Sequence, residues 1–371
     1  MSTDHVEETV KRRLSVFRQN DWAATNQAVE ELAALGKAAV SILIAALSDQ
    51  NAKVREGVAR ALGKIRDPHA VPALERALRN EQLAPENEEG DDTDARAEAA
   101  LALGAIGDFS AFEPLTTMLA EALETDWTLS WYIIDALGML GDTRAVPLLI
   151  NAVEHSDIDV QKSALHALVS FGQVAVAPLV DIVLDKDSRA VRTLAVRALG
   201  AIGDPRAAPA LVRLIEDHDN HTLVRAGAAS ALGQVGADQA YSLLLQLFKS
   251  GNEDENVRWG AAVGLGHLGD RRALDPLLAA LEDADWPMRH SLAEAFGYLG
   301  DQRAVEPLMK LLRDRRSEVV WQAVQALGKL GDARAIPELT WLQSHCEDRF
   351  LKDSIKSEVT ESIRKIVEQT S

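Results

Sequence analysis

The sequence predicts an all-α protein, an α-α superhelix (α-solenoid) of about eleven stacked helical pairs with a C-terminal capping helix. Three observations predict it: a seven-residue motif recurs along the chain, its copies are about 31 residues apart, and each period divides into two amphipathic helical segments. Such pairs are too small to bury their own apolar faces, so each must stack on its neighbours. We therefore expect residues 1–371 to form a single solenoid.

The repeated motif reads Ala-Leu-Gly-x-x-Gly-Asp or a close variant. Its copies occupy residues 61–67, 102–108, 136–142, 198–204, 231–237, 264–270, 295–301 and 326–332, and degenerate copies lie near Gly36 and Ala167. Successive anchor positions are separated by 30, 41, 34, 31, 31, 33, 33, 31 and 31 residues. The one long interval contains residues 81–94, which we interpret as an acidic loop inserted between two repeats.

Each period begins with one predicted helix and ends with another. The first, as in residues 270–283 or 301–314, carries a proline about six residues past the Gly-Asp turn, where a missing N–H is tolerated. The second, as in residues 255–269, contains small residues that allow close packing and ends at a glycine suited to a left-handed cap. The last pair covers residues 334–345 and 350–369, and its polar second helix indicates a cap over residues 349–371.

The unit D-x-R-A-V-x-P-L-x-x-x-L-x-D-x-x-x-x-V-R-x-x-A-A-x-A-L-G-x-I-G-D resembles the short HEAT-like repeat named after phycobilisome lyases. The resemblance covers essentially the whole chain. It implies a HEAT-like α-solenoid with first helices on the convex side and second helices on the concave side. This repeat occurs in adaptor, chaperone-like and bilin-handling proteins, so it implies less about function than about fold.

Two charged positions recur once per repeat. Second helices carry Arg55, Arg96, Arg192, Arg225, Arg258 and Arg289, and the motif ends in Asp67, Asp108, Asp142, Asp204, Asp270, Asp301 and Asp332. A residue that every unit carries is explained best by something every unit needs. We therefore expect a ladder of Arg–Asp hydrogen bonds between adjacent turns, in preference to ligand binding.

Function is expected where repeats differ, at columns of residues that second helices place side by side on the concave face. We expect these positions to be exposed, because the intervening alanines face the core. Five of the seven tryptophans fall on this face. Because aromatic side chains are enriched at the centres of interfaces, we expect the face to bind a partner. The candidate binding residues are Trp127, Trp131, Tyr132, Asp135, His166, Arg197, Trp259, Val263, His267, Trp286, His290, Glu294, Tyr298, Trp321, Gln325 and Lys329.

Each unusual feature also has an ordinary interpretation. The indoles could simply pack between repeats and enlarge the core. If they do not, Trp259, His290 and Trp321 in adjacent repeats would form one continuous binding patch. The insertion at 81–94 has seven carboxylates and no base, which suits a solvated loop. The alternative is a tether for a basic partner or a loose divalent-ion site.

Composition and motifs exclude several classes of function. The net charge of −18 argues against nucleic acid, and no segment has the roughly 20 apolar residues of a membrane span. None of the nine histidines is followed by Glu, which excludes the His-Glu iron ligands of related hydroxylases. The single cysteine, Cys346, excludes a disulfide framework or a Cys-based zinc cluster, and no glycine loop for nucleotides is present. We expect no metal site and no catalytic residue.

Our leading hypothesis is a non-catalytic scaffold or adaptor, a cytoplasmic monomer without cofactor, that binds a helix or extended segment of another protein in its concave groove. The alternative follows from the resemblance: a bilin-handling protein related to E/F-type phycobilin lyases, acting in chromophore attachment, removal or chaperoning. An open-chain tetrapyrrole would need aromatic walls, a carboxylate such as Asp135 or Glu294 near its pyrrole nitrogens, and Arg197 or Lys329 for its propionates.

Overall fold

The computed structural model describes residues 3–19, 21–79, 93–184, 189–237, 239–345 and 352–370. Within these residues the chain forms 22 α-helices linked by short turns and 3-10 helices, and no strand. The predicted all-α architecture of eleven helical pairs is therefore confirmed. Most of the acidic insertion, residues 81–92, lies outside the described residues, as do Cys346 and residues 349–351 of the predicted cap.

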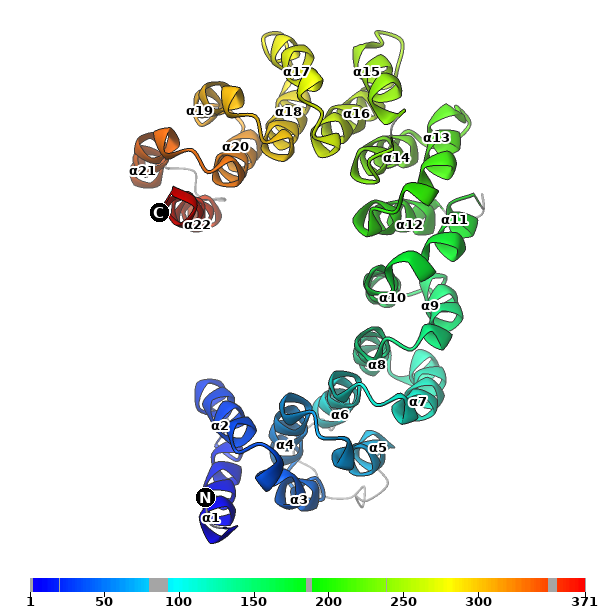
Figure 1. Cartoon of the computed structure of the whole chain (residues 1–371), viewed down its shortest axis with the longest axis vertical. Coiled ribbons are helices and arrows are strands. Elements are labelled where there is room, and N and C mark those ends of the chain that lie inside the picture. Colours follow the sequence, from blue (N-terminus) through cyan, green and yellow to red (C-terminus); the bar gives the residue numbers. More distant parts are fainter. Residues whose placement is uncertain are drawn as a thin grey trace. The chain divides into compact units, whose positions relative to one another are not determined.

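The packing of the helices divides the chain into two compact units, Met1–Pro178 and Leu179–Ser371. Each unit is described by itself, and the single solenoid over residues 1–371 stays a prediction. In each unit the helices alternate between two rows, which we call the odd-numbered row and the even-numbered row (Figure 1). The odd-numbered helices are the predicted first helices, and the even-numbered helices are the predicted second helices.

The first unit contains the first ten helices of the chain, and its first helical pair, α1 and α2, precedes the regular motif. Its helices are α1 (Thr3–Phe17), α2 (Trp22–Ala34), α3 (Lys37–Ala46), α4 (Ala52–Ile65), α5 (Val71–Arg79), α6 (Thr93–Ile106), α7 (Phe112–Thr125), α8 (Trp127–Leu140), α9 (Val146–Val153) and α10 (Ile158–Ser170). Helix α11 (Val176–Leu184) includes the division between the units.

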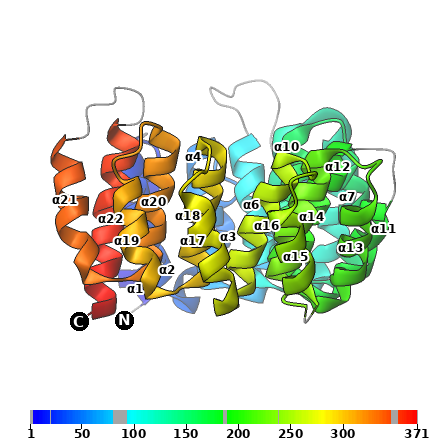
Figure 2. The ribbon, with the colours of Figure 1, turned by 90° about the horizontal axis from the view of Figure 1, so that it is seen from above.

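The second unit continues the same alternation, and Figure 2 shows its helices from the side, lying next to one another. They are α12 (Arg189–Ile202), α13 (Ala208–Glu216), α14 (Thr222–Gln234), α15 (Ala240–Lys249), α16 (Glu255–Leu268), α17 (Leu274–Leu281), α18 (Trp286–Leu299), α19 (Val305–Leu311), α20 (Ser317–Leu330), α21 (Ile336–His345) and α22 (Lys352–Thr370). The terminal helix α22 packs on α20 and α21.

The Gly-Asp turn ends one repeat and begins the next. Its glycine takes a left-handed conformation, with φ of 72° at Gly141 and 70° at Gly300, as predicted for a cap. The aspartate then accepts a hydrogen bond from the backbone N–H two residues later, as Asp142 does from Arg144, and so caps a three-residue 3-10 helix. The α-helix that follows begins directly after this turn, and its proline lies in the first helical turn, where the prediction placed it.

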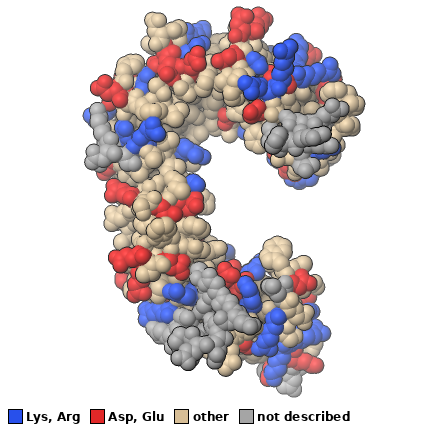
Figure 3. Space-filling view, turned by 180° about the vertical axis from the view of Figure 1, so that it is seen from behind, with Lys and Arg blue, Asp and Glu red and all other residues tan. Residues whose placement is uncertain are grey.

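The predicted Arg–Asp ladder is wrong in its partners. The motif aspartate pairs with an arginine of its own turn: Arg144 Nη2 lies 2.6 Å from Asp142 Oδ2, and the same pair recurs at Arg206, Arg272, Arg303 and Arg334. The arginine follows the aspartate by only two residues, so the two side chains meet within one turn. Acidic and basic side chains accordingly lie interspersed over the face shown in Figure 3.

The helix arginines have a different structural role. Five of them, Arg55, Arg96, Arg225, Arg258 and Arg289, donate to backbone carbonyls in or just after the preceding helix. Three reach the loop that follows the next odd-numbered helix, in the pairs Arg192–Asn220, Arg225–Glu253 and Arg289–Asp314. These charge-assisted bonds therefore fix each repeat on its neighbour.

Neighbouring even-numbered helices approach so closely that only small residues fit between them. A Cβ on Gly266 of α16 would lie 2.5 Å from both Cα and the carbonyl oxygen of Ala295 on α18. A Cβ on Gly233, Gly260 or Gly264 would likewise meet the backbone of α14 or α16. The close approach sets the register between helices, and thereby decides which side chains become neighbours along the row.

We expect Gly266→Ala to lower the free energy of unfolding by about 2 kcal/mol, because the added methyl forces α16 and α18 apart. Alanine is intrinsically better than glycine inside a helix by about 1 kcal/mol, so a loss of stability isolates the steric effect. Urea unfolding followed by circular dichroism measures it. The control is Gly251→Ala, where an added Cβ meets nothing within 4 Å. Equal stability of the two variants would contradict the close-packing interpretation.

Candidate functional site

The candidate residues fall into both units. Trp127, Trp131, Tyr132 and Asp135 lie on α8 and His166 lies on α10, all in the first unit. Arg197 lies on α12 in the second unit and is exposed. The remaining candidates belong to α16, α18 and α20 of the second unit, where they are close enough to act together.

Three successive turns of α16, α18 and α20 form what we call the nine-residue face. Residues four apart lie on one side of a helix, and adjacent helices in register place three such columns side by side. The alanines between them are buried, as predicted. The columns are Trp259, Val263 and His267 on α16; His290, Glu294 and Tyr298 on α18; and Trp321, Gln325 and Lys329 on α20.

A continuous line of side-chain contacts crosses this face near the C-terminal ends of the helices. The Gln234 amide nitrogen on α14 lies 3.1 Å from Nε2 of His267. The His267 and Tyr298 rings are tilted by 33° with centroids 3.7 Å apart. Lys329 Nζ lies 3.6 Å from the centroid of the Tyr298 ring, in cation–π geometry. Four consecutive repeats are thus joined by polar and aromatic contacts.

His267 is held in its neutral form. Burial, and to a smaller extent the nearby positive charge of Lys329, together lower its pKa to about 4. Since an amide nitrogen can only donate, Nε2 of His267 accepts the bond from Gln234, and the ring proton lies on Nδ1. The imidazole therefore presents an uncharged aromatic surface to Tyr298 at neutral pH.

Glu294 occupies the centre of the nine-residue face. It is half-buried, and no described residue donates a hydrogen bond to its carboxylate. Burial raises its pKa, while His290 on the same helix and Lys329 on α20 act in the opposite direction. The face therefore combines an unbonded acceptor with surrounding aromatic and basic side chains.

The exposure of the candidates differs from the prediction. Val263 is only 9% exposed, so the expectation that it lies on the surface is wrong: its short side chain is covered by the larger ones around it. Trp259, His290, Trp321 and Gln325 are half-buried. The ring contact on this face joins His267 to Tyr298. Trp259 on α16 and Trp321 on α20 have α18, with His290, between them.

Trp286 lies one turn beyond the nine-residue face and is 39% exposed. The guanidinium of Arg316 lies over its ring at 4.9 Å from the centroid. In the first unit Trp127 is 49% exposed and makes an edge contact with His155, with centroids 5.8 Å apart. These two indoles are the most exposed of the predicted candidates of their type.

The sequence-based candidates missed the most exposed indole, which also begins an even-numbered helix. Trp22 is 77% exposed and is the first residue of α2, just as Trp127 and Trp286 are the first residues of α8 and α18. Each follows an aspartate whose side chain caps the helix. The signal was present as a dipeptide, Asp-Trp, that occurs three times in the sequence.

The first unit contains a smaller version of the same chemistry. Burial raises the pKa of Asp135, and His166 on the next even-numbered helix lowers it in part. Trp131 and Tyr132 are half-buried beside it on α8. The Trp131 indole Nε1 is buried and has no hydrogen-bond partner among the described residues.

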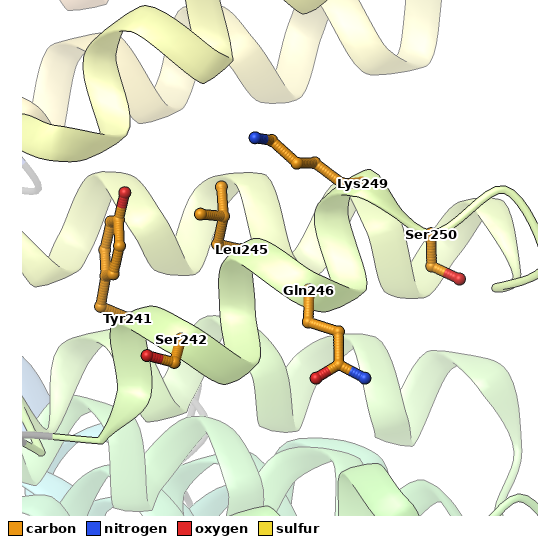
Figure 4. A pocket seen from close by; sticks show the side chains of 6 residues that line it. All are labelled: Tyr241, Ser242, Leu245, Gln246, Lys249 and Ser250. Carbon is orange, nitrogen blue, oxygen red and sulfur yellow. The ribbon is translucent and has the colours of Figure 1, made fainter.

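The odd-numbered row has open pockets that contain none of the predicted residues. One of about 550 Å³ lies along α15, and Tyr241, Leu245 and Lys249 project on one side of that helix (Figure 4). Tyr241 is already engaged there, because its hydroxyl donates to the Arg272 carbonyl and the Arg272 guanidinium covers its ring. Another of about 670 Å³, between α13 and α15, is lined mainly by apolar residues.

Within the described ranges, His, Cys, Asp and Glu side chains do not gather in groups of three that could hold a metal ion. No helix among these residues is long and apolar enough to cross a membrane. The Asp94 end of the acidic insertion is described, and its carboxylate lies 3.1 Å from Lys53 Nζ on α4.

The repeats match a known family over most of the chain. Residues 10–89, 116–193, 176–255, 221–295 and 274–357 match the sequence profile of HEAT repeats. The chain belongs to the HEAT-repeat family. Residues 95–125 match the profile of the PBS lyase HEAT-like repeat, which confirms the resemblance seen in the motif.

Two relatives of this HEAT-repeat protein have names that refer to phycocyanobilin or phycocyanin. Phycocyanobilin lyase subunit alpha of Nostoc sp. (strain PCC 7120) is 33% identical over 191 residues, 47% of this chain and 66% of the relative. Uncharacterized phycocyanin operon protein Z of Pseudanabaena tenuis is 27% identical over 174 residues, 45% of this chain and 82% of the relative. Yeast importin-beta (Kap95p) is similar in fold alone, with 14% identity and a TM-score of 0.50 over 94% of this chain and 52% of that one.

The neutral state of His267 gives a prediction. We expect its imidazole to titrate near pH 4 in the folded protein and Lys329→Met to raise that pKa, because one of its two causes is removed. A histidine whose folded pKa is lowered contributes stability above its unfolded pKa, and loses it as pH falls from about 6.5 toward 4. His267→Gln should therefore lose less stability than the wild type between pH 7 and pH 5.

NMR of the imidazole nitrogens measures the titration, and urea unfolding at the two pH values measures the stability. Lys310→Met on α19 is the matched control, since this lysine lies on the odd-numbered row. A His267 pKa near 6.5 would contradict the burial argument.

Proposed function

We propose that this HEAT-repeat protein handles an open-chain tetrapyrrole (bilin), in chromophore attachment, removal or chaperoning, and does so with a protein partner. The observation that carries the proposal is the 33% identity to a phycocyanobilin lyase subunit over 191 residues. Similarity to a protein of a phycocyanin operon supports the same chemistry. These relatives favour bilin handling over a scaffold that binds protein alone.

The nine-residue face suits such a ligand. A bilin is a long conjugated molecule with pyrrole nitrogens and propionate carboxylates, so it needs aromatic surface, a hydrogen-bond acceptor and a positive charge. Trp259, Trp321 and Tyr298 supply aromatic surface, Glu294 supplies the acceptor, and Lys329 supplies the charge. These residues lie on three adjacent even-numbered helices, α16, α18 and α20. We propose this face as the bilin site.

We propose that the protein partner binds at residues outside the nine-residue face. Trp127 and Trp286 expose large apolar surfaces at the beginnings of even-numbered helices, and exposed tryptophans are typical of the energetic centres of protein interfaces. The partner would be the bilin's client or a second lyase-type subunit, since the relative is by name one subunit of a lyase.

The test of bilin handling is a titration of the purified chain with phycocyanobilin. We expect a change in the bilin absorbance spectrum together with quenching of tryptophan fluorescence, because two indoles would lie against the ligand. The double variant Trp259→Ala, Trp321→Ala should weaken the affinity by about ten-fold or more through lost aromatic contact. Trp341→Ala is the matched control, because Trp341 lies on α21 in the odd-numbered row and stacks on His345.

No spectral change at saturating protein would overturn bilin handling and leave the protein-binding scaffold as the remaining function. Equal weakening by the control variant would instead remove the nine-residue face as the site, while bilin handling would stand.

A further inference from the structure

Two large apolar side chains are exposed on neighbouring helices of the first unit. Trp127 and Ile158 are the first residues of α8 and α10, which pack on each other in the even-numbered row. Trp127 is 49% exposed and Ile158 is 46% exposed. Equivalent positions of packed helices are about 10 Å apart, which two such side chains span. They therefore form one apolar surface at the edge where the even-numbered helices begin.

The Trp127 indole is held in place before any partner binds. The His155 ring, from the loop before α10, packs edge-on against it with centroids 5.8 Å apart. His155 is itself fixed at both ring nitrogens. Its Nδ1 accepts a hydrogen bond from the Asp157 backbone N–H, so its Nε2 carries the proton and donates to the Leu123 carbonyl oxygen, 3.3 Å away. An indole that is already ordered loses little conformational entropy when an interface forms over it.

Unpaired carboxylates surround this apolar surface. Residues 112–170, from the start of α7 to the end of α10, contain nine acidic residues and two basic ones. Both basic residues, Arg144 and Lys162, already form ion pairs within this segment. Three of the glutamates are exposed and form no ion pair with a described residue: Glu121, Glu124 and Glu154. We call these three carboxylates, together with Trp127 and Ile158, the Trp127 edge.

Folding does not explain the three glutamates, because their positions are unfavourable. Glu124 lies in the last turn of α7, and Glu154 is the C-cap of α9. The C-terminal end of a helix carries partial negative charge, so a carboxylate there costs stability. Glu121 and Glu124 also repel each other, because residues three apart lie on one side of a helix. Four other odd-numbered helices, α5, α13, α15 and α19, carry Lys or Arg in the last turn. A positively charged partner would remove both costs.

We propose that the Trp127 edge binds a basic segment of the protein partner. An apolar side chain of that segment packs on Trp127 and Ile158, and flanking Lys or Arg side chains face the three carboxylates. This inference rests on the proposed function, since it names the chemistry of the partner that this function requires. An apolar centre with a polar rim is the usual arrangement of a protein interface. The indole supplies most of the affinity, while the rim charges raise the association rate and select the partner.

Trp286, the other indole that we assign to protein binding, has the opposite surroundings. The Arg316 guanidinium lies over its ring, 4.9 Å from the centroid. Arg315 and Arg316 are both exposed, and neither forms an ion pair with a described residue. These charges would repel a basic segment. The proposal therefore concerns the first unit alone, and Trp286 provides a matched control.

The test uses the full-length chain and a fluorescent lysine–leucine peptide, KLKKLLKKLK, whose binding is followed by fluorescence anisotropy. Two further peptides separate charge from apolar contact. The peptide ELEELLEELE reverses the charge, and KSKKSSKKSK keeps the charge and removes the apolar side chains. We expect the lysine–leucine peptide to bind the wild type, and the other two to bind about ten-fold more weakly or worse, because each lacks one of the two contacts.

Variants of the chain locate the binding. Trp127→Ala should weaken binding of the lysine–leucine peptide by about ten-fold or more, as for an indole at the centre of an interface. Trp286→Ala should leave it unchanged. If Trp127→Ala melts at a lower temperature because the His155 contact is lost, Ile158→Ala tests the same surface without removing that contact. Wild-type affinity in both variants would overturn the proposal.

A triple variant tests the rim: Glu121→Gln, Glu124→Gln and Glu154→Gln. A control triple changes the net charge equally by removing exposed carboxylates of the second unit: Glu216→Gln, Glu255→Gln and Glu306→Gln. We expect the rim triple to weaken binding by about five-fold or more and to flatten its dependence on salt, and the control triple to stay within about two-fold of the wild type. Equal weakening by the two triples would overturn the edge as the site.

The melting temperature of the rim triple tests the argument from the helix ends. It should be no lower than that of the wild type, because neutral amides do not oppose the negative ends of α7 and α9. A clearly lower melting temperature would mean that the glutamates stabilise the fold, and would overturn the inference drawn from their positions.

Failure of this inference is distinguishable from failure of the proposed function, because the nine-residue face lies in the second unit. If ELEELLEELE bound as tightly as the lysine–leucine peptide, or if neither bound, the basic segment would be ruled out while phycocyanobilin binding could still establish bilin handling. If the wild type bound the lysine–leucine peptide at the Trp127 edge but not phycocyanobilin, bilin handling would fail and the docking surface would stand.

Discussion

The close approach of successive even-numbered helices is the constraint on which the rest of this structure depends. A helical pair of this size cannot bury its own apolar face, so stability comes from stacking on the next pair. Glycine and alanine at the crossing points, such as Gly266 against Ala295, allow backbones to touch. Contact at this distance leaves one register available, and that register aligns the side chains of neighbouring repeats into columns.

The recurrent polar groups serve the same end. Each motif aspartate caps its own 3-10 turn and pairs within it, as Asp142 does with Arg144. Each helix arginine ties its repeat to a backbone carbonyl or to the next loop, as the Arg225–Glu253 pair shows, with both side chains nearly buried. Because these groups hold the repeats together, the outward positions of the even-numbered helices are free to differ between repeats.

Those outward positions carry the chemistry from which we argue function. On α16, α18 and α20 they bring together indoles, a neutral imidazole, a phenol, an amine and an unbonded carboxylate. No single helix supplies such a set, and a solenoid obtains it only by aligning three repeats. The same principle explains how one repeat family can serve unrelated ligands: the scaffold is constant while the columns vary.

The sequence by itself determined the helical pairs, their number, the glycine caps and which residues share a column, because the 31-residue period and the four-residue spacing of a helix are both local properties. The tertiary structure decided which charged side chains pair, since the motif aspartates form ion pairs with arginines two residues away in their own turns. It also decided exposure, burying Val263 and leaving Trp22 open at the start of α2. Burial and pairing depend on which atoms of other repeats come near, and a pattern along one chain does not contain those distances.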